Sequence, residues 1–458
     1  MKAQIFNLFI LSFLSLHAIA QQVSPFKEND RVVFLGNSIT DGGHYHSYIW
    51  LYYMTRFPDR PLTVLNAGVG GDRAEEMFKR LDGDVFSKKP TVLITTFGMN
   101  DTGYFEYNEP GAEAFADKRV NESHEWYKKI ESRLKKLSGT RLVLMGSSPY
   151  DETAQIENNA FRNKNKAMMR IVDFQRKAAL ENKWEFIDLN APMTEINERM
   201  QKTNPSFTLC GKDRIHPDND GHMVMAYLFL KAQGFAGKEV AAIDIDAANA
   251  VVKSESNCVI SHLKKTDAGL SFNYLAKALP YPLDTIARGW EQQKGQAKAL
   301  EVIPFMDEMN GEILKVSGLN GNYTLLIDDE EIGTWTAEDF SKGINLAALT
   351  HTPQYQQALK IMHLNEERLD IEHRFRDYMW MEYTCFGGTD LLFACNRAAL
   401  KELDKHLDNG WVRAKRDIYV KAMLPEVREA WQNEMDLLVS TIYKINQPVV
   451  RKITLIRS

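Results

Sequence analysis

Short apolar runs alternate with longer amphipathic stretches between residue 31 and about residue 234, and this alternation constrains the fold more than any other feature of the chain. The stretches between the runs carry apolar residues at the three- and four-residue spacing of helices. Strands that alternate with helices in this way form a parallel sheet covered by helices. The strands are expected at 32–35, 62–66, 92–96, 142–145 and 186–189, and the helices at 74–86, 122–137 and 156–182.

The first twenty residues predict export. Lys2 is followed by an apolar stretch over 5–16 and then by Ala18-Ile19-Ala20, the pattern of a signal peptide with its cleavage site. The apolar stretch is shorter than the roughly 20 residues of a membrane-spanning helix. No cysteine follows the site, so a lipoprotein anchor is not indicated. We expect a signal peptide at 1–20, no membrane insertion after its cleavage, and a mature protein that is periplasmic or secreted by a bacterium.

Composition and length describe an ordinary soluble protein of several parts. The 458 residues are 44% apolar and 26% charged, with a formal net charge of -5 and no basic block, which argues against a nucleic-acid partner. We expect a catalytic domain at 27–237, a small β-containing region at 238–350 and a helical region at 351–458. Asn320-Gly321 predicts a hairpin in the second part, and long helices are expected at 354–381 and 419–446. The sequence does not indicate an oligomeric state.

The four cysteines leave two interpretations open. They could form disulfides in an oxidising compartment, where three pairings exist and a Cys385–Cys395 loop is one of them, or all four could be free thiols. Their spacing is not that of a zinc site, and neither a metal nor a cofactor is predicted. The cysteines are Cys210, Cys258, Cys385 and Cys395.

Residues that could carry chemistry follow three of the predicted strands. The first strand ends in Gly-Asn-Ser at Ser38, the second is followed by a glycine-rich loop over 66–72, and the third by a loop that contains Asn100. Because the carboxyl ends of parallel strands face the ligand crevice, we expect these loops to meet. Farther along, Asp213 lies three residues before His216, a spacing that allows the carboxylate to orient the imidazole.

Together these blocks resemble the SGNH, or GDSL, hydrolase superfamily, and the resemblance covers about residues 31–234. It implies a three-layer α/β/α fold with a flavodoxin-like parallel sheet. It also implies that Ser38 is the nucleophile and that Asp213 and His216 act with it as a catalytic triad. The oxyanion hole would consist of the backbone N–H groups of Ser38 and Gly71 and the side-chain amide of Asn100.

Some positions have simpler interpretations. A serine after a strand often only caps a helix, Asp213 could cap the next turn, and Gly70 rivals Gly71 as an oxyanion donor. The family usually has aspartate where this chain has Asn37, a change that affects the surroundings of the serine rather than the triad. The G-x-S-x-G elbow of α/β-hydrolases would need glycine where Thr40 stands.

The predicted function is hydrolysis of O-acyl esters by a secreted serine esterase. The resemblance suggests O-acetyl groups on carbohydrate, so the partner would be an acylated small molecule or polysaccharide. Alternatives are an acyl thioesterase or lysophospholipase with the same triad, and a non-catalytic glycan-binding protein on the same fold. Tyr104 and Tyr107, which follow the oxyanion asparagine, are predicted to form a wall on which a sugar stacks.

Overall fold

The computed structural model describes residues 23–158, 160–266, 268–290 and 293–458. The predicted signal peptide at 1–20 therefore lies outside the described residues. Within those ranges, no helix has both the length and the apolar character that crossing a membrane requires.

The first part of the chain forms a parallel sheet. Its strands within the described residues are β1 (Arg31–Gly36), β2 (Thr63–Gly68), β3 (Val92–Thr95), β4 (Arg141–Gly146) and β5 (Glu185–Asp188). They lie in the order β2-β1-β3-β4-β5, and every neighbouring pair is parallel. This is the flavodoxin-like order. The chain adds β2 on one side of β1 and then adds β3, β4 and β5 on the other side. The predicted fold class is confirmed.

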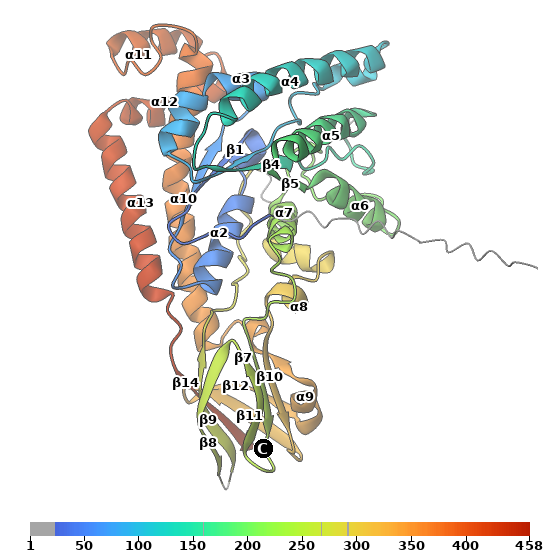
Figure 1. The fold of residues 1–458 in the computed structure, drawn as a ribbon, viewed down its shortest axis with the longest axis vertical. Helices are drawn as coiled ribbons and strands as arrows, with labels where there is room; N and C mark the ends of the chain where they lie inside the picture. The colour runs from blue at the N-terminus through green and yellow to red at the C-terminus, as the bar shows by residue number, and fades with distance from the viewer. Residues whose placement is uncertain (1–22, 159, 267, 291–292) are drawn as a thin grey trace, which may run out of the picture.

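Helices cover both faces of this sheet (Figure 1). One face is covered by α2 (Tyr45–Arg56), α6 (Asn190–Gln201) and α7 (Asn219–Ala232), and the other by α3 (Ala74–Lys79), α4 (Ala112–Leu134) and α5 (Lys164–Asn182). Along β1, Val32 and Phe34 enter the first core, and Val33 and Leu35 enter the second. A strand that is buried on both faces has to be apolar throughout, which is why the sequence shows runs rather than alternation.

The middle of the chain forms two sheets that pack face to face. In the described residues one sheet has the order β13-β10-β6-β7 and the other the order β12-β11-β14-β9-β8. Ile243 and Leu314 of the first sheet share a core with Phe272, Leu325 and Leu455 of the second. The strands are β6 (Ala241–Asp246), β7 (Val251–Ser256), β8 (Cys258–Thr266), β9 (Gly269–Ala276), β10 (Glu312–Ser317), β11 (Asn322–Ile327), β12 (Glu330–Thr336), β13 (Ile344–Asn345) and β14 (Arg451–Arg457), with helix α9 (Ala337–Lys342) between β12 and β13. We call this part the sandwich.

The hairpin predicted at Asn320-Gly321 is wrong. The strands on either side of it, β10 and β11, belong to different sheets, so the chain crosses between the sheets at this point. The hairpin in this stretch is β11–β12, which turns at Asp328 and Asp329. Both residues have positive φ, at 53° and 68°, as the two central residues of a type I′ turn require.

The last part of the chain is mostly helical. Helix α10 (Pro353–Phe386) is followed by α11 (Arg397–Leu403), α12 (Gly410–Ala422) and α13 (Pro425–Ile445). The second long helix expected in this part is two helices, because Pro425 begins α13 and cannot continue α12. The final strand, β14, then returns to the sandwich and lies between β9 and β11. All four cysteines are free thiols.

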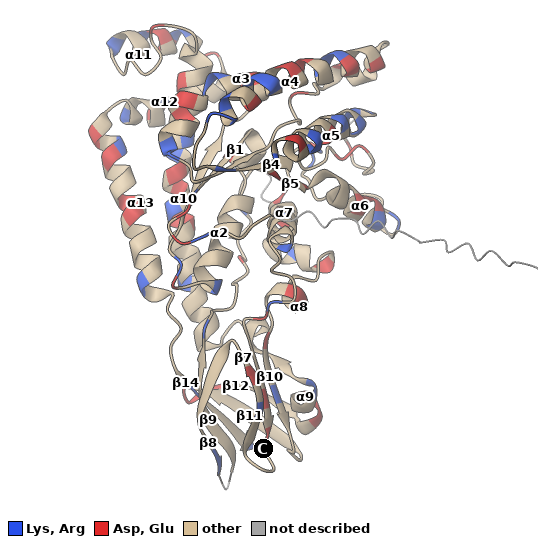
Figure 2. Cartoon of the chain, viewed as in Figure 1, with Lys and Arg blue, Asp and Glu red and all other residues tan. Residues whose placement is uncertain are grey.

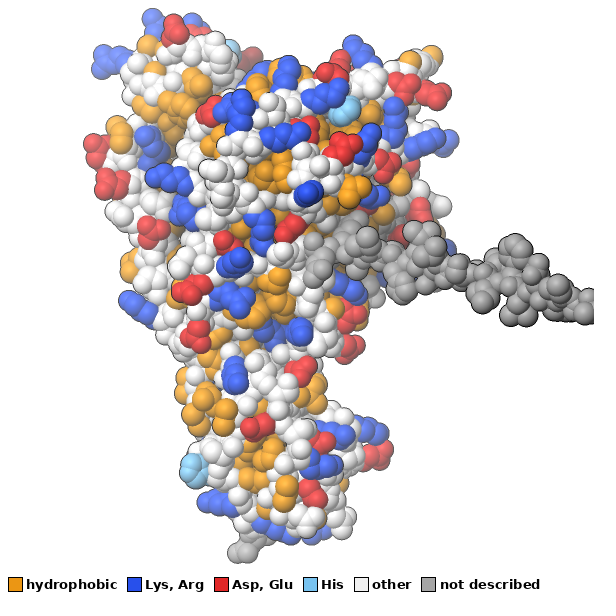
Figure 3. Space-filling view, viewed as in Figure 1, with side chains coloured by type: hydrophobic (Ala, Val, Ile, Leu, Met, Phe, Trp, Pro, Cys, Tyr) orange, Lys and Arg blue, Asp and Glu red, His pale blue; other side chains and the backbone are white. Residues whose placement is uncertain are grey.

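Charged residues lie mainly on the helices that surround the parallel sheet and not on its central strands. Figure 2 shows acidic and basic residues along α4, α5 and α13, while the central strands carry few of them. Over the face in Figure 3 the two signs are interspersed, in the upper part and in the sandwich below.

Candidate active site

Ser38 lies at the first position of the short helix α1 (Ser38–Asp41), directly after β1. The Asn37 side chain accepts a hydrogen bond from the Ile39 N–H at 3.0 Å and so caps α1, as a serine or aspartate would. Gly36 has to be glycine, because a Cβ there would lie 2.0 Å from the Thr40 hydroxyl oxygen. The serine is therefore fixed at the end of a rigid strand, with only 6% of its surface exposed.

His216 connects Ser38 to Asp213. The His216 Nε2 atom lies 2.8 Å from the Ser38 Oγ atom, and the His216 Nδ1 atom is hydrogen-bonded to the Asp213 carboxylate. The other Asp213 oxygen accepts the backbone N–H groups of Ile215 and His216 at 2.8 and 3.0 Å. Burial opposes ionisation of Asp213, but the hydrogen bond from His216 and these N–H groups hold its pKa below the ordinary value. A carboxylate in this position keeps the proton of His216 on Nδ1 and leaves Nε2 free to accept from the serine.

Arg214 anchors the loop that carries this pair. It is buried, has a positive φ of 66°, and donates to the backbone carbonyls of Asp151, Ala154 and Asn158 at 2.6–3.1 Å. This role of Arg214 was not predicted from the sequence. An arginine between the aspartate and the histidine looks like a surface residue until its partners, more than fifty positions away, are known.

The glycine-rich loop offers one free N–H group. The Gly70 N–H donates to the Asp41 carboxylate at 3.0 Å, so this N–H is not available to a substrate oxygen. Gly71 has a φ of 87°, and within the described residues its N–H has no acceptor. The geometry thus favours Gly71 over Gly70 as an oxyanion donor. Burial raises the pKa of Asp41 to about 6.

The Asn100 side chain is held from both ends. Its Nδ2 atom donates to the Asp72 carbonyl at 3.0 Å, and its Oδ1 atom accepts from the Tyr104 hydroxyl. These contacts fix which end of the amide is the donor and use one of its two N–H bonds. The neighbouring Asp101 accepts the N–H groups of Gly98 and Ala74, both at 3.0 Å, which joins this loop to the loop after β2.

The two tyrosines predicted as a sugar wall make contacts with the protein in this structure. Tyr107 is buried among core residues and donates to the Thr102 carbonyl at 3.0 Å. Tyr104 orients Asn100, and the buried Lys164 ammonium lies 4.1 Å from the centre of its ring. Both rings therefore support the loop that carries the asparagine.

Helix α10 reaches the same loops from the edge of the sheet. Its Glu372 accepts the backbone N–H of Asn66 in β2, and its Arg376 donates to the Asn66 carbonyl, both at 2.8 Å. The Asn66 side chain in turn donates to the carbonyls of Thr40 and Asp41 at 2.9 and 3.0 Å. Farther along α10, Trp380 donates to the Gly70 carbonyl at 3.1 Å. The helical region thus holds the turn that carries Ser38 and the glycine-rich loop in place.

Two tryptophans form a partly exposed wall beside His216. The Trp290 ring lies 4.5 Å from the His216 ring and 6.0 Å from the Trp411 ring, with which it is stacked. Trp290 is 48% exposed and Trp411 is 60% exposed. Neither was predicted, because nothing in the sequence connects positions so far from the catalytic blocks to the site.

Comparison with known proteins identifies the family. Residues 34–224 match the GDSL-like lipase/acylhydrolase family, and residues 359–447 match the diltiazem deacetylase C-terminal helical domain. A solved structure of a gut microbial diltiazem-metabolizing enzyme is 58% identical, with a TM-score of 0.95, and the match covers 96% of this chain and 100% of that one. The chain belongs to the GDSL-like lipase/acylhydrolase family. The predicted resemblance is confirmed, and this GDSL hydrolase is a carboxylic ester hydrolase.

More distant relatives match the catalytic part. An acetylxylan esterase of Geobacillus stearothermophilus is 24% identical over 221 residues, which are 45% of this chain and 94% of that protein. An uncharacterized lipoprotein of Bacillus subtilis (strain 168) is 32% identical over 108 residues, which are 22% of this chain and 44% of that protein. The second family match covers most of α10 through α13, so the helical region is a domain type with relatives of its own.

Proposed function

We propose that this GDSL hydrolase removes O-acetyl groups from ring-bearing alcohols, carbohydrates in particular, with Ser38, His216 and Asp213 as its catalytic triad. The observation that carries the proposal is the continuous hydrogen-bonded chain from the Ser38 hydroxyl through both ring nitrogens of His216 to the Asp213 carboxylate. A serine needs such a base, and a base needs such an orienting group, to attack an ester at neutral pH.

The reaction follows from these positions. As Ser38 Oγ attacks the ester carbonyl, its proton moves to His216 Nε2, and Asp213 stabilises the imidazolium that forms. The tetrahedral intermediate collapses when His216 returns this proton to the departing alcohol, leaving an acetyl group on Ser38. Water then attacks the acetyl carbonyl, loses a proton to His216, and releases acetate as the serine regains its proton.

Three donors are proposed for the oxyanion. The N–H groups of Ser38 and Gly71 have no acceptor in the described residues, and the Asn100 amide keeps one N–H bond for the substrate. All three belong to loops that other contacts hold in position, so they need little rearrangement as negative charge develops on the oxygen.

The wall of Trp290 and Trp411 supports a ring in the alcohol part of the substrate. A flat apolar face beside the proton donor of the leaving group can stack on a sugar or another ring. The acetyl part of the proposal is supported by two matches, one to a helical domain named after a diltiazem deacetylase and one to a protein named acetylxylan esterase.

The proposal is tested by hydrolysis of an aryl acetate and of acetylated xylo-oligosaccharide. We expect Ser38→Ala to lower kcat at least about a thousandfold on both substrates. The matched control is Ser341→Ala on α9 of the sandwich, which should keep the wild-type rate. Equal rates for Ser38→Ala and the control would overturn the triad.

Two further measurements test the substrate. Rates on aryl esters of increasing acyl length should fall beyond acetate, and faster cleavage of long chains or of thioesters would favour the thioesterase alternative. Trp290→Ala should raise KM for the acetylated oligosaccharide more than for the small aryl acetate. An equal change in KM for both would remove the stacking role.

Export belongs to the same proposal. It rests on the signal-like pattern of residues 1–20, and a relative that is named as a lipoprotein is compatible with it. Amino-terminal sequencing of the protein secreted by a bacterial host should begin near Gln21. A product that retains residues 1–20 would contradict export by cleavage.

A further inference from the structure

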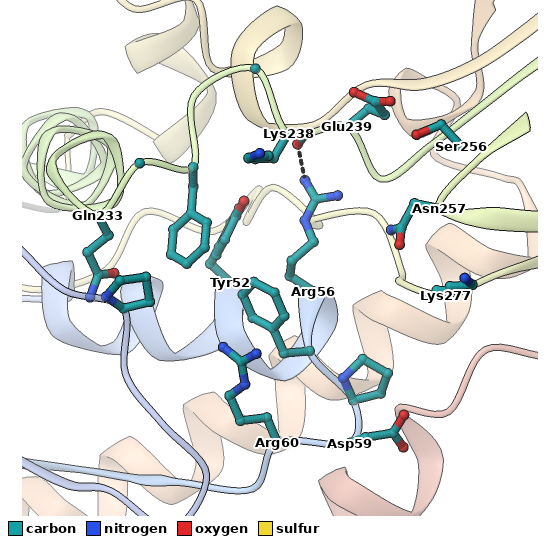
Figure 4. Close-up of a pocket in the computed structure, with 16 residues that line it drawn as sticks. Tyr52, Arg56, Asp59, Arg60, Gln233, Lys238, Glu239, Ser256, Asn257 and Lys277 are labelled. Atoms are coloured by element: carbon teal, nitrogen blue, oxygen red, sulfur yellow. Dashed lines mark hydrogen bonds between the residues drawn. The ribbon is translucent and has the colours of Figure 1, made fainter.

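A cavity of about 900 Å³ lies at the junction of the catalytic part and the sandwich, away from the triad (Figure 4). The end of α2 and the loop after it contribute Tyr52, Arg56 and Arg60 to its wall, and the turn after α7 contributes Gln233. The sandwich side contributes Lys238, Glu239, Ser256, Asn257 and Lys277. Cavities of roughly 300–1,000 Å³ are the usual size of small-molecule sites.

Arg56 is the unusual residue of this cavity. It is only 7% exposed, and its Nη2 atom donates to the carbonyls of Lys238, at 3.0 Å, and Met309. Its Nη1 atom has no hydrogen-bond partner among the described residues. In Figure 4 the guanidinium is directed into the space between Lys238, Glu239 and Asn257. A buried donor without an acceptor costs about 1–3 kcal/mol, and more when it is charged.

No carboxylate in the described residues forms an ion pair with Arg56. Three other buried arginines do have such partners, since Arg80, Arg368 and Arg376 each contact an aspartate or glutamate at 2.5–2.8 Å. The buried Arg214 has no carboxylate partner, but its guanidinium donates to several backbone carbonyls instead. Buried charges are normally paired, because removing an ion from water is expensive. Burial accordingly lowers the pKa of Arg56, and the nearby Tyr52, Glu239 and Glu312 oppose this effect only in part.

The remaining charges of the cavity also favour an anion. Arg60, Lys238 and Lys277 add three cations to Arg56, whereas Asp59 and Glu239 are the acidic side chains that line it. This leaves an excess of two positive charges. A planar carboxylate can accept from a guanidinium and from a lysine at once, and such charge-assisted hydrogen bonds are about twice as strong as neutral ones.

We propose that this cavity binds an organic carboxylate, with the carboxylate accepting from Arg56 Nη1. The ligand could be a uronic-acid unit of a glycan or a free carboxylic acid, because both present the same group. The site would bridge the catalytic part and the sandwich, and it does not depend on the triad, so either proposal can fail without the other.

The test is calorimetric titration of the full-length protein with glucuronate, succinate, glucose and inorganic phosphate. Glucuronate or succinate should bind, with an affinity that falls as salt is added, and glucose should not. Tighter binding of glucuronate than of succinate would identify the glycan source, and the reverse order the free acid. Arg56→Gln should weaken carboxylate binding about tenfold, the effect of removing a charged donor.

Two variants control for folding and for charge. Lys277→Gln changes an exposed residue of the rim and should weaken binding two- to threefold without unfolding the protein. Lys401→Gln makes the same charge change on the distant helix α11 and should have no effect. All three variants should keep the wild-type rate on aryl acetate. Carboxylate binding that is undetectable, insensitive to both Arg56→Gln and Lys277→Gln, or weaker than phosphate binding would overturn the proposal.

Discussion

Strand β1 and strand β2 are neighbours in the same sheet, yet different kinds of side chain bury them. The side chains of β1 are apolar on both faces, whereas the outer edge of β2 is covered by charged residues of α10. Apolar packing has no direction and specifies a position only through shape. The hydrogen bonds that Glu372 accepts from the Asn66 N–H and Arg376 donates to the Asn66 carbonyl do have a direction. They occupy backbone groups that an edge strand would leave open to other chains. The edge strand β2, which leads into the glycine-rich loop, is therefore held in a more specific position than the strands in the interior of the sheet.

The charged interface continues beneath the active centre through Asp84. This buried aspartate accepts from Arg80 at 2.7 Å and from Arg376 at 2.8 Å, and it also pairs with Lys88. Arg80 in turn donates to the Gly36 carbonyl at 2.9 Å, directly before the turn that carries Ser38. Burial alone would raise the pKa of Asp84, but Arg376, Lys88 and Arg80 outweigh burial and hold it well below the ordinary value.

The largest effect is expected when this interface is broken. Asp84→Asn should lower the free energy of unfolding by about 3–5 kcal/mol, because it leaves buried cations without their carboxylate. Leu93→Ala, in the apolar core of β3, should cost about 2–5 kcal/mol as a cavity. Urea titrations measure both values.

The pH dependence separates these two variants. A carboxylate whose pKa is lowered by folding stabilises the protein above the unfolded-state pKa of about 4, and this contribution is lost as the pH falls further. Wild type and Leu93→Ala should therefore lose stability steeply below pH about 4, and Asp84→Asn less steeply. An unchanged acid slope in Asp84→Asn would show that Asp84 is not the group responsible.

The next largest effect concerns Asn100, the side chain proposed to donate to the oxyanion. Asn100→Ala should lower kcat about a hundred- to a thousandfold, the usual result of removing one oxyanion donor. Tyr104→Phe removes only the hydroxyl that orients this amide and should lower kcat less than about tenfold. Steady-state kinetics on an aryl acetate check both variants, and equal losses would contradict the assignment of Asn100 as the donor.

A smaller effect is expected for the contact between α10 and the glycine-rich loop. Trp380→Phe keeps an aromatic, though smaller, side chain but removes the hydrogen bond to the Gly70 carbonyl, which corresponds to about 0.5–1.5 kcal/mol. Expressed as kcat, this is a loss of about two- to tenfold, with KM nearly unchanged. Trp335→Phe in the sandwich is the matched control. If Trp380→Phe and Trp335→Phe both retain full activity, the hydrogen bond from α10 does not hold the glycine-rich loop in its active position.

The smallest effect is expected at the outer side of the tryptophan wall. Trp411→Ala should raise KM for acetylated oligosaccharide about threefold, through loss of stacking against Trp290, and should leave kcat unchanged. Because Trp411 lies in the first turn of α12, a change in kcat would indicate that the helical region acts on the reacting atoms as well as on the substrate.

The contrast between core and edge also explains what the sequence could predict. The strands of the parallel sheet were predicted to within two residues at each end, because burial on both faces requires apolar runs. The serine, asparagine, aspartate and histidine blocks were recognisable because each follows a strand or precedes a helix at a short, fixed spacing. Local pattern was sufficient for these features.

Long-range polar contacts could not be predicted in this way. Glu372 and Arg376 look like the solvated face of an amphipathic helix, and only the fold shows that they are buried against β2. The same applies to β14, whose partners β9 and β11 are more than a hundred residues away. Asn320-Gly321 suited a hairpin locally, but the pattern contains no information about which sheet each flanking strand joins.

The central claim is that Ser38 is the nucleophile, and covalent labelling tests it most directly. Wild-type protein treated with a serine-directed fluorophosphonate should carry one modification, which peptide mass spectrometry should locate on Ser38. His216→Ala should react far more slowly, because the hydroxyl then lacks its base. Modification of a different serine, or undiminished labelling of Ser38→Ala, would contradict this account of the active site.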